Sequence, residues 1–548
     1  MPTPIACNEP VVPMTSMRSA RLWRTLLQPG LPGTLILSKI QLNHGVVDES
    51  PIKFEDRVLA AYVAVVNKFI ALHGEAAKGF MMRAPEALDL VGLHVEEFGG
   101  ATLGLACFES VLFVSPRADS KVTIAHIEDR FAPSEFDLAE APKTRTLDWP
   151  AYAAEHRGKA GATSWADAIK GALLYYVNRH KGPTGQVELK IPGLNIVVGS
   201  VLPPGYTAPS DTTLAAAALA SAMAASGEWG NVPLAEFSAW CAEAQAWGTG
   251  RKNTLGAVCF GMAGELVHAS ANPPKPKTRA LPHGHAVLIA HTGLPDSGTP
   301  AHASFRATTT QVGWAFLQKE AAARAAAATR GNDVLPNDDQ VLEMLRTVPS
   351  SISRPAVLES KLGEPFVTNL KKRFAIHPAP ESGYPARAKL LFVLAEMQRS
   401  ARAADALRSG DVTRLAAYMN IGQVGEASNY HKLSASGRIE ATLPIHQASS
   451  DEELLSMSDH GDPLWRQSGR SGGSTPETDL LADLAMNIPG VLAARWSGSQ
   501  RVAILCKHEV VKLLTDALNG AYYVGRSLDV TQLVSQVFPC RGVGIVED

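Results

Sequence analysis

Two uncharged apolar runs constrain this chain more than any other feature of its sequence. They span Leu214–Ser226 and Leu255–Gly264, and both are shorter than the roughly 20 residues that a membrane-crossing helix needs. We therefore expect a soluble, globular protein that makes no membrane contact.

The composition supports more than one such core. The chain has 548 residues, of which 46% are hydrophobic and 19% charged, which excludes disordered and fibrous proteins and favours two or three domains. Its 51 Lys and Arg residues nearly balance 53 Asp and Glu residues, for a formal net charge of −2. Because no long stretch is strongly basic, nucleic-acid binding is disfavoured. We expect a small-molecule partner.

The six cysteines indicate the compartment in which the protein works. They are scattered without a CxxC pair, which argues against a disulfide framework and against a cysteine zinc site. We therefore predict a cytoplasmic protein without a metal centre. An organelle-targeting segment remains the alternative, since residues 11–47 lack any acidic side chain and carry Arg18, Arg21 and Arg24 at a spacing of three.

Strand patterns and connectors predict how the chain is organised. Residues 1–75 form an extension that ends in a helix pattern over Phe54–Leu72. A proline-punctuated connector at Asn272–Leu281 places a domain boundary near residue 285. The first strand patterns, for which we expect antiparallel pairing, lie at Phe80–Met82, Ala101–Cys107 continuing into Ser110–Ser115, and Lys121–Ile127. Further strands are predicted at Leu194–Leu202, Ala286–Ala290, Ala503–Cys506 and Gly542–Glu547.

Helical periodicity recurs on both sides of the predicted boundary, which indicates a mixed α and β protein. The helix patterns lie at Ser164–Asn178, Thr212–Ala225, Leu234–Trp247, Leu317–Arg330, Tyr384–Ser409, Val412–Gly422 and Glu509–Ala521.

Three segments resemble, in order and in spacing, the three motifs of the GHMP kinases, and specifically of the galactokinase and L-arabinokinase branch. The branch's sugar-binding signature, RAPGRVNLIGEHTDYNGG, is matched without a gap by residues 83–100, RAPEALDLVGLHVEEFGG. Its phosphate loop, LPxGxGLSSSAA, is similar to residues 202–213, LPPGYTAPSDTT. Its SCPELDxLVxxA segment and third, Gly-rich motif are similar to residues 474–498, STPETDLLADLAMNIPGVLAARWSG.

The resemblance implies an α+β, two-lobed GHMP-kinase-like fold with an N-terminal extension. It divides the chain into the extension at residues 1–75, an N-terminal-like lobe at 76–285 and a C-terminal-like lobe at 286–548. In the family, ATP lies on the phosphate loop and a sugar hydroxyl faces its γ-phosphate, with Mg²⁺ between them. An active protein of this type would therefore be an ATP-dependent sugar kinase, a phosphotransferase with an alcohol acceptor.

The two residues that carry catalysis in the family are replaced in this chain. Ala87 stands where the family has an Arg that steadies the attacking hydroxyl. The family's catalytic Asp falls on Ala257 when residues 250–264 are aligned without a gap, whereas a shift of four residues places Asn253 there. Both registers stay open, and neither side chain can accept a proton.

The phosphate loop and the sugar site keep only part of their polar groups. Pro209 removes a backbone N–H from the loop and Asp211 adds a negative charge at the start of the helix. The Gly-rich third motif is shortened to Gly498-Ser-Gln-Arg501. The remaining phosphate-loop candidates are Gly205, Ser210, Thr212 and Thr213, and the remaining sugar-site candidates are Asp89, His94, Glu96 and His302.

A formal hydrolase motif is also present but lacks its context. Residues 469–473 match GxSxG, yet the loop is polar, with no strand pattern before it and no helix pattern directly after it. We therefore do not predict a serine hydrolase.

Two functions follow from these observations. Since losing a general base costs about 10²–10⁴ in rate, we favour a catalytically silent paralogue, a pseudokinase that binds a sugar, a nucleotide or a protein partner. The alternative is a divergent, active ATP-dependent sugar-1-kinase with altered specificity, in which Asn253, Lys252 and Ser210 replace the usual residues.

Overall fold

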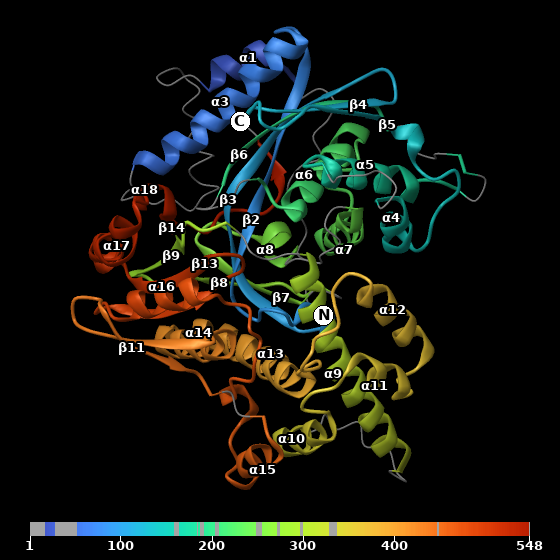
Figure 1. Cartoon of the computed structure of the whole chain (residues 1–548). Coiled ribbons are helices and arrows are strands. Elements are labelled where there is room, and N and C mark those ends of the chain that lie inside the picture. Colours follow the sequence, from blue (N-terminus) through green and yellow to red (C-terminus); the bar gives the residue numbers. More distant parts are fainter. Residues whose placement is uncertain are drawn as a thin grey trace. The chain divides into compact units, whose positions relative to one another are not determined.

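The computed structural model divides into two compact units (Figure 1). The first contains Met1–Asp89, Glu96–Leu281 and Val537–Asp548, and the second contains Leu90–Val95 and Pro282–Gln536. The structure describes residues 17–27, 52–157, 164–182, 185–186, 191–202, 208–247, 255–270, 274–295, 300–327, 337–446 and 449–546.

Within the described residues, the first unit is built on a nine-stranded sheet whose main path runs β1-β2-β3-β6-β4-β5. β15 pairs with β2, β7 pairs with β3, and β8 pairs with β7. The long central strand β3 is buried along nearly its whole length, so both faces of the sheet are covered there. The strands are β1 (Arg18–Ser19), β2 (Lys78–Val91), β3 (Ala101–Pro116), β4 (Lys121–His126), β5 (Ser134–Asp137), β6 (Leu194–Val201), β7 (Glu265–Ser270), β8 (Lys277–Ala280) and β15 (Gly544–Ile545).

The antiparallel pairing predicted between β3 and β4 is wrong. β6 lies between them and pairs antiparallel with β3 and parallel with β4. The reason is burial: β6 is an apolar strand that needs neighbours on both edges and a cover on its faces. A short turn between β3 and β4 does not by itself make a hairpin when a more apolar strand competes for the same edge.

The first of the two apolar runs forms helix α6 (Asp211–Ser226), in which every residue from Thr212 to Ala225 is buried. Its alanines allow close packing on α5 and β3, and Gly227 ends it in the left-handed conformation that favours glycine. The second run begins as α8. The other helices of this unit are α1 (Ala20–Leu26), α3 (Ile52–His73), α4 (Trp149–Arg157), α5 (Asp167–Arg179), α7 (Leu234–Ala244), α8 (Leu255–Phe260), η2 (Glu96–Phe98), η3 (Leu138–Glu140) and η4 (Gln245–Trp247).

The second unit contains a four-stranded sheet of order β12-β13-β9-β14 and a separate hairpin, β10-β11. The strands predicted at Ala286–Ala290 and Ala503–Cys506 are confirmed as adjacent, antiparallel strands β9 and β13. The bounds are β9 (His285–His291), β10 (Asn429–Leu433), β11 (Ile439–Pro444), β12 (Val491–Trp496), β13 (Arg501–Lys507) and β14 (Val534–Val537).

Two of the predicted helices of the second unit, α13 and α14, pack on each other, and α14 also packs on β12. α14 continues four residues beyond its predicted end, as far as Glu426. In the part of the chain that the structure describes, no helix combines the length and apolar character required to span a membrane. The helices are α9 (Pro300–Ala327), α10 (Asp338–Thr347), α11 (Arg354–Glu359), α12 (Glu364–Phe374), α13 (Ala386–Arg408), α14 (Val412–Glu426), α15 (Asp451–Asp459), α16 (Pro476–Met486), α17 (Val511–Leu518), α18 (Val530–Leu533), η5 (Leu464–Arg466), η6 (His508–Val510), η7 (Asn519–Tyr523) and η8 (Val524–Arg526).

Candidate functional site

The N-terminus of α6, in the first unit, is the place to which the resemblance assigns phosphate binding. Ser210 caps this helix, since its Oγ accepts from Thr213 N (3.2 Å) and donates to Thr213 Oγ1 (2.9 Å). Thr213 Oγ1 donates in turn to Pro85 O (2.8 Å). The N–H of Ser210 donates to Oε1 of the buried Glu86 (2.9 Å). A carboxylate of the protein therefore uses one of the donors that a phosphate would use.

The other described phosphate-loop candidates also lie among polar and acidic groups of the protein. Thr212 Oγ1 donates to Gln245 Oε1 (3.0 Å), and Asp211 adds a second acidic group to the first turn of α6. Gly205 lies outside the described residues. The described groups at this helix end do not fit a triphosphate, because they already place negative charge there. Nor do the described residues include a group of three or more His, Cys, Asp or Glu side chains suited to hold a metal ion.

Ala87 and Ala257 lie together. Ala257, Ala106 and Cys540 form a small buried cluster, and Ala87 packs against it. The two positions that the resemblance assigns to a catalytic cation and a catalytic base therefore hold methyl groups in one apolar contact. Asn253, the residue of the alternative register, lies outside the described residues.

The sugar-site candidates divide between the two units. Asp89 and Glu96 belong to the first, and His94 and His302 belong to the second. His302 is exposed in the first turn of α9. His94 is the one of the four that the second unit places in a buried polar network, and it adopts a left-handed backbone conformation there, with φ of 68°.

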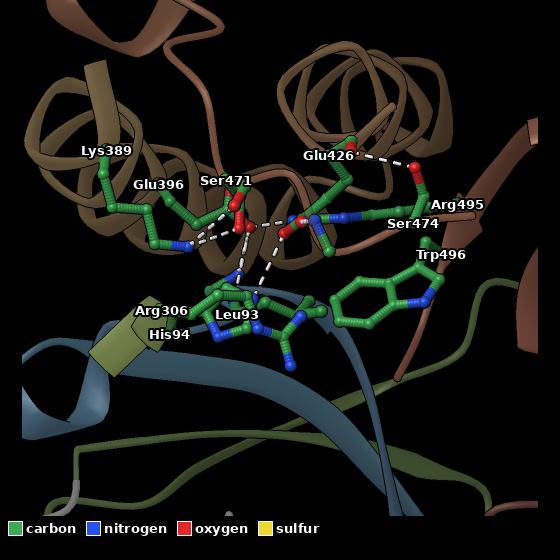
Figure 2. A network of polar contacts seen from close by, with 12 residues as sticks. Leu93, His94, Arg306, Lys389, Glu396, Glu426, Ser471, Ser474, Arg495 and Trp496 are labelled. Atoms are coloured by element: carbon green, nitrogen blue, oxygen red, sulfur yellow. Dashed lines mark hydrogen bonds and ion pairs between the residues drawn. The ribbon is translucent and has the colours of Figure 1, made fainter. Parts of the chain in front are cut away.

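The centre of that network is the buried carboxylate of Glu396 on α13 (Figure 2). Oε1 accepts from Gly92 N (2.7 Å) and Leu93 N (3.3 Å), and it forms an ion pair with Arg495 NH1 (2.6 Å). Oε2 accepts from Arg399 Nε (2.7 Å). One carboxylate thus holds the segment Leu90–Val95 against α13 and β12, and it compensates two buried guanidinium groups.

A second carboxylate, Glu426 at the end of α14, lies beside His94. Its Oε1 is 3.4 Å from His94 Nε2, and its Oε2 accepts from Gly473 N (3.0 Å). Burial lowers the pKa of His94 to about 4, so its imidazole is neutral at pH 7. Burial raises the pKa of Glu426, but His94 and the charges of Lys389 and Arg495 outweigh it and leave the pKa at about 2. Glu426 is therefore an anion.

Lys389 of α13 completes the network. Its Nζ donates to Ser471 Oγ (2.6 Å) and to Ser471 O (3.3 Å). Burial lowers the pKa of Lys389 to about 7, Glu426 opposes this shift and Arg306 adds to it. Arg306 lies over the ring of Trp496, 5.6 Å from its centroid. An ionised carboxylate and an amine that changes charge near pH 7, both buried, thus lie in one cluster with a neutral and partly exposed imidazole.

Replacing Lys389 with methionine should change how stability depends on pH. Below the folded pKa of about 7, the folded protein carries the full cost of burying an ammonium group. Between that value and the unfolded pKa of about 10.4, only the unfolded state binds the proton, so the cost is relieved as pH rises. Relative to Lys389→Met, the wild type should gain up to about 1.4 kcal/mol of unfolding free energy per pH unit in this window.

Urea denaturation across this pH range measures the difference. Lys371→Met is the matched control, because Lys371 is exposed on α12, and it should show no such trend. A difference between wild type and Lys389→Met that stays constant with pH would contradict the shift.

The sequence patterns gave no indication that Lys389, Glu396, Glu426 or Arg495 are site residues, and Ser471 stood out only as the serine of the rejected GxSxG match. One signal was available within α13. Lys389, Glu396 and Arg399 stand at a helical spacing that puts them on one face, and that face is buried. Charges on the buried stripe of an amphipathic helix indicate buried partners. The partners themselves lie on other elements, where no local pattern points to them.

No family model and no curated protein sequence matches the chain. Several solved structures match the chain in fold. Lactococcus lactis galactokinase, in complex with galactose, has 17% identity and a TM-score of 0.55, covering 89% of this chain and 99% of that one. The Lin0012 protein from Listeria innocua has 12% identity and a TM-score of 0.44, covering 86% and 100%. Methanococcus jannaschii mevalonate kinase has 13% identity and a TM-score of 0.40, covering 85% and 99%.

Of these three, only the galactokinase is similar enough in structure to support a conclusion, and at 17% identity the likeness shows the fold alone. It confirms the predicted fold class. The chain is an α+β protein with a GHMP-kinase-like fold.

Proposed function

We propose that this chain is a galactokinase-like pseudokinase, which has lost phosphoryl transfer and binds a sugar or a nucleotide. The observation that carries the proposal is the apolar contact between Ala87 and the cluster around Ala257. Phosphoryl transfer depends almost entirely on positioning and on electrostatic stabilisation of the transferred group. A site with methyl groups at the positions of its cation and its base supplies neither.

The expected loss of rate is large. Removing a general base costs about 10²–10⁴ in rate, and removing one charge-stabilising donor costs about 10²–10³. These losses do not simply add. Either loss alone slows transfer by about 100-fold or more unless another group substitutes, and Asn253 cannot act as a base.

The position of Glu86 also argues against binding of a nucleotide triphosphate, and so against kinase activity. Its carboxylate accepts from Ser210 N and is buried at the helix end where the family holds phosphate. A like charge a few ångströms away costs on the order of 1–4 kcal/mol at a protein surface. A triphosphate would have to displace this carboxylate or tolerate its charge.

Phosphate transfer from ATP to a panel of aldoses, with Mg²⁺ present, tests the proposal. We expect no transfer above background at high protein concentration, while at least one sugar or nucleotide raises the melting temperature of the same preparation. Ligand at about 100 times its dissociation constant adds about 2.7 kcal/mol of stability. Transfer that is lost in Ser210→Ala would establish the divergent kinase instead. If no compound shifts the melting temperature, a protein partner is the remaining ligand.

The variant Glu86→Gln tests whether the negative charge of Glu86 opposes phosphate binding at the N-terminus of α6. The amide keeps an oxygen that can accept from Ser210 N but removes the negative charge, so inorganic tripolyphosphate should bind at least about tenfold more tightly than to the wild type. Glu135→Gln, a change at an exposed carboxylate on β5 of the same unit, is the control and should leave the affinity unchanged. Equal affinities for wild type and Glu86→Gln in calorimetric titration would show that Glu86 does not block the helix end.

The cytoplasmic location predicted from the cysteines belongs to the same proposal. Five cysteines among the described residues are buried and form no disulfide bond, which is compatible with a reducing compartment.

A further inference from the structure

The GxSxG segment that the sequence left without a role is pressed against α13 and α14 in the second unit. Gly469 and Gly472 flank Ser471 with φ of 56° and 63°. A Cβ on Gly469 would lie 2.3 Å from the backbone N of Phe392, and Ser471 N donates to Gly425 O (2.7 Å). The loop therefore holds Ser471 in one position rather than leaving it free in solvent.

Lys389 makes a specific contact with this serine. Its Nζ donates to Ser471 Oγ at 2.6 Å and to Ser471 O at 3.3 Å, and both residues are buried (Figure 2). The Nζ also lies over the ring of Phe392, 5.5 Å from the centroid. A lysine amine that is neutral can accept the proton of a hydroxyl at this distance, which is how a serine becomes a nucleophile.

The surroundings of Lys389 allow part of its amine to be neutral near pH 7. Burial is the largest cause of its lowered pKa, and Arg306 of α9 adds to it. Glu426 of α14 opposes the shift, and His94 is neutral because its own pKa is about 4. With a pKa of about 7, a substantial fraction of Lys389 is an amine at pH 7.

We propose that Ser471 and Lys389 form a serine–lysine dyad that takes up the acyl group of an activated ester. Ser471 Oγ attacks the carbonyl carbon and forms a C–O bond while its proton moves to Lys389 Nζ. The tetrahedral adduct then breaks the bond to the leaving oxygen, which receives that proton from Nζ. The products are an O-acyl serine and a free alcohol.

Water completes the cycle with the same groups. It attacks the acyl carbon, Lys389 takes its proton, and the acid departs as Ser471 Oγ recovers the proton. Gly472 follows the nucleophile, at the position whose backbone N–H belongs to the oxyanion hole in enzymes with a GxSxG motif. Its N–H makes only a long contact of 3.4 Å with Gly425 O, so a better acceptor can displace that contact at little cost.

A purely structural role makes a different prediction. If Lys389 only anchors the loop through Ser471 O and Oγ, its removal lowers stability but leaves the intrinsic reactivity of the serine unchanged. If the two form a dyad, removal of the amine abolishes base catalysis, which is worth about 10²–10⁴ in rate. The reactivity of Ser471 should also follow the protonation of Lys389.

The test uses the full chain with p-nitrophenyl acetate, a small activated ester. We expect a burst of p-nitrophenol and an acetyl group on Ser471 in peptide mass spectrometry, with a rate that rises with pH through a midpoint near 7. Ser471→Ala should lose the adduct, and Lys389→Met should slow its formation by at least about 100-fold. Ser474→Ala removes a neighbouring hydroxyl that donates to Glu426 O (2.9 Å) and should react as the wild type does.

Circular dichroism of each variant confirms that the fold is kept. If Lys389→Met does not fold, Lys389→Arg replaces it, because arginine keeps the positive charge but cannot act as a base. The absence of an adduct on Ser471 in the folded wild type would overturn the dyad. Acetylation of Lys389→Met or Lys389→Arg at the wild-type rate would overturn it as well.

Discussion

Replacing Glu396 with alanine is expected to lower the free energy of unfolding by about 3–5 kcal/mol, which is the usual cost of removing one partner from a buried ion pair. Glu396 is fully buried together with Arg399 and Arg495. Its loss would remove the carboxylate with which both guanidinium groups form their ion pairs. It would also remove the acceptor for the backbone N–H groups of Gly92 and Leu93.

The surrounding structure offers little compensation. Arg399 NH2 and the Nε and NH2 atoms of Arg495 already have no hydrogen-bond partner among the described residues. Arg495 packs directly on Gly422 of α14, where even an added Cβ would lie 2.5 Å from its Cζ. The two cations would therefore stay buried without the carboxylate that now pairs with them, and much of their desolvation cost would be uncompensated.

Urea denaturation followed by tryptophan fluorescence measures this effect. Glu396→Gln should be less damaging than Glu396→Ala, because an amide oxygen still accepts hydrogen bonds although it carries no charge. Glu359→Ala, at an exposed position on α11, is the matched control and should change stability by less than about 0.5 kcal/mol. A loss below about 1 kcal/mol for Glu396→Ala would show that the network does not hold the second unit together.

Gly469→Ala should destabilise the protein by about 2–5 kcal/mol, the sum of two separate costs. The first is left-handed backbone strain, because φ is 56°, and it amounts to about 1–2 kcal/mol for a residue with a Cβ. The second is overpacking, typically about 1–3 kcal/mol. Here the new Cβ would lie 2.3 Å from Phe392 N and 2.8 Å from Ala388 O, which are backbone atoms of α13 and cannot rotate away.

Gly472→Ala separates the two costs. Its φ of 63° is nearly the same, but nothing lies within 4 Å of an added Cβ, so only the strain of about 1–2 kcal/mol should appear. The difference between the two variants in unfolding free energy therefore reports how tightly the loop is pressed on α13. Equal losses would mean that the loop moves away freely and does not fix the position of Ser471.

The helices were predictable because their signal is local. The periodicity over residues 384–409 and the alanine-rich run after residue 211 predicted α13 and α6 nearly to their ends. The order and spacing of three motifs predicted the fold class. The hairpin between β3 and β4 was predicted wrongly, because a strand nearly 70 residues further along the chain, β6, takes the place between them.

The polar network could not be predicted in the same way. The carboxylate of Glu396 accepts a hydrogen bond from the N–H of Gly92, which lies 304 positions earlier in the chain. The amine of Lys389 donates one to the hydroxyl of Ser471, which lies 82 positions later. No local pattern connects residues at such separations. The GxSxG segment was set aside because it lacks a strand before it, yet the property that gives Ser471 a chemical role is the buried amine of another element.

The sequence by itself determined which side chains stand where the resemblance places the groups of a kinase site. Ala87, Pro209 and Asp211 stand at three of these places, where a methyl group cannot stabilise charge, proline has no N–H to donate and a carboxylate repels phosphate. Only the tertiary structure decided which of the remaining charges act together. Burial converts ordinary side chains such as Lys389 and Glu396 into strongly coupled groups, since charges interact far more strongly when water is excluded, and burial is a property of the assembled fold.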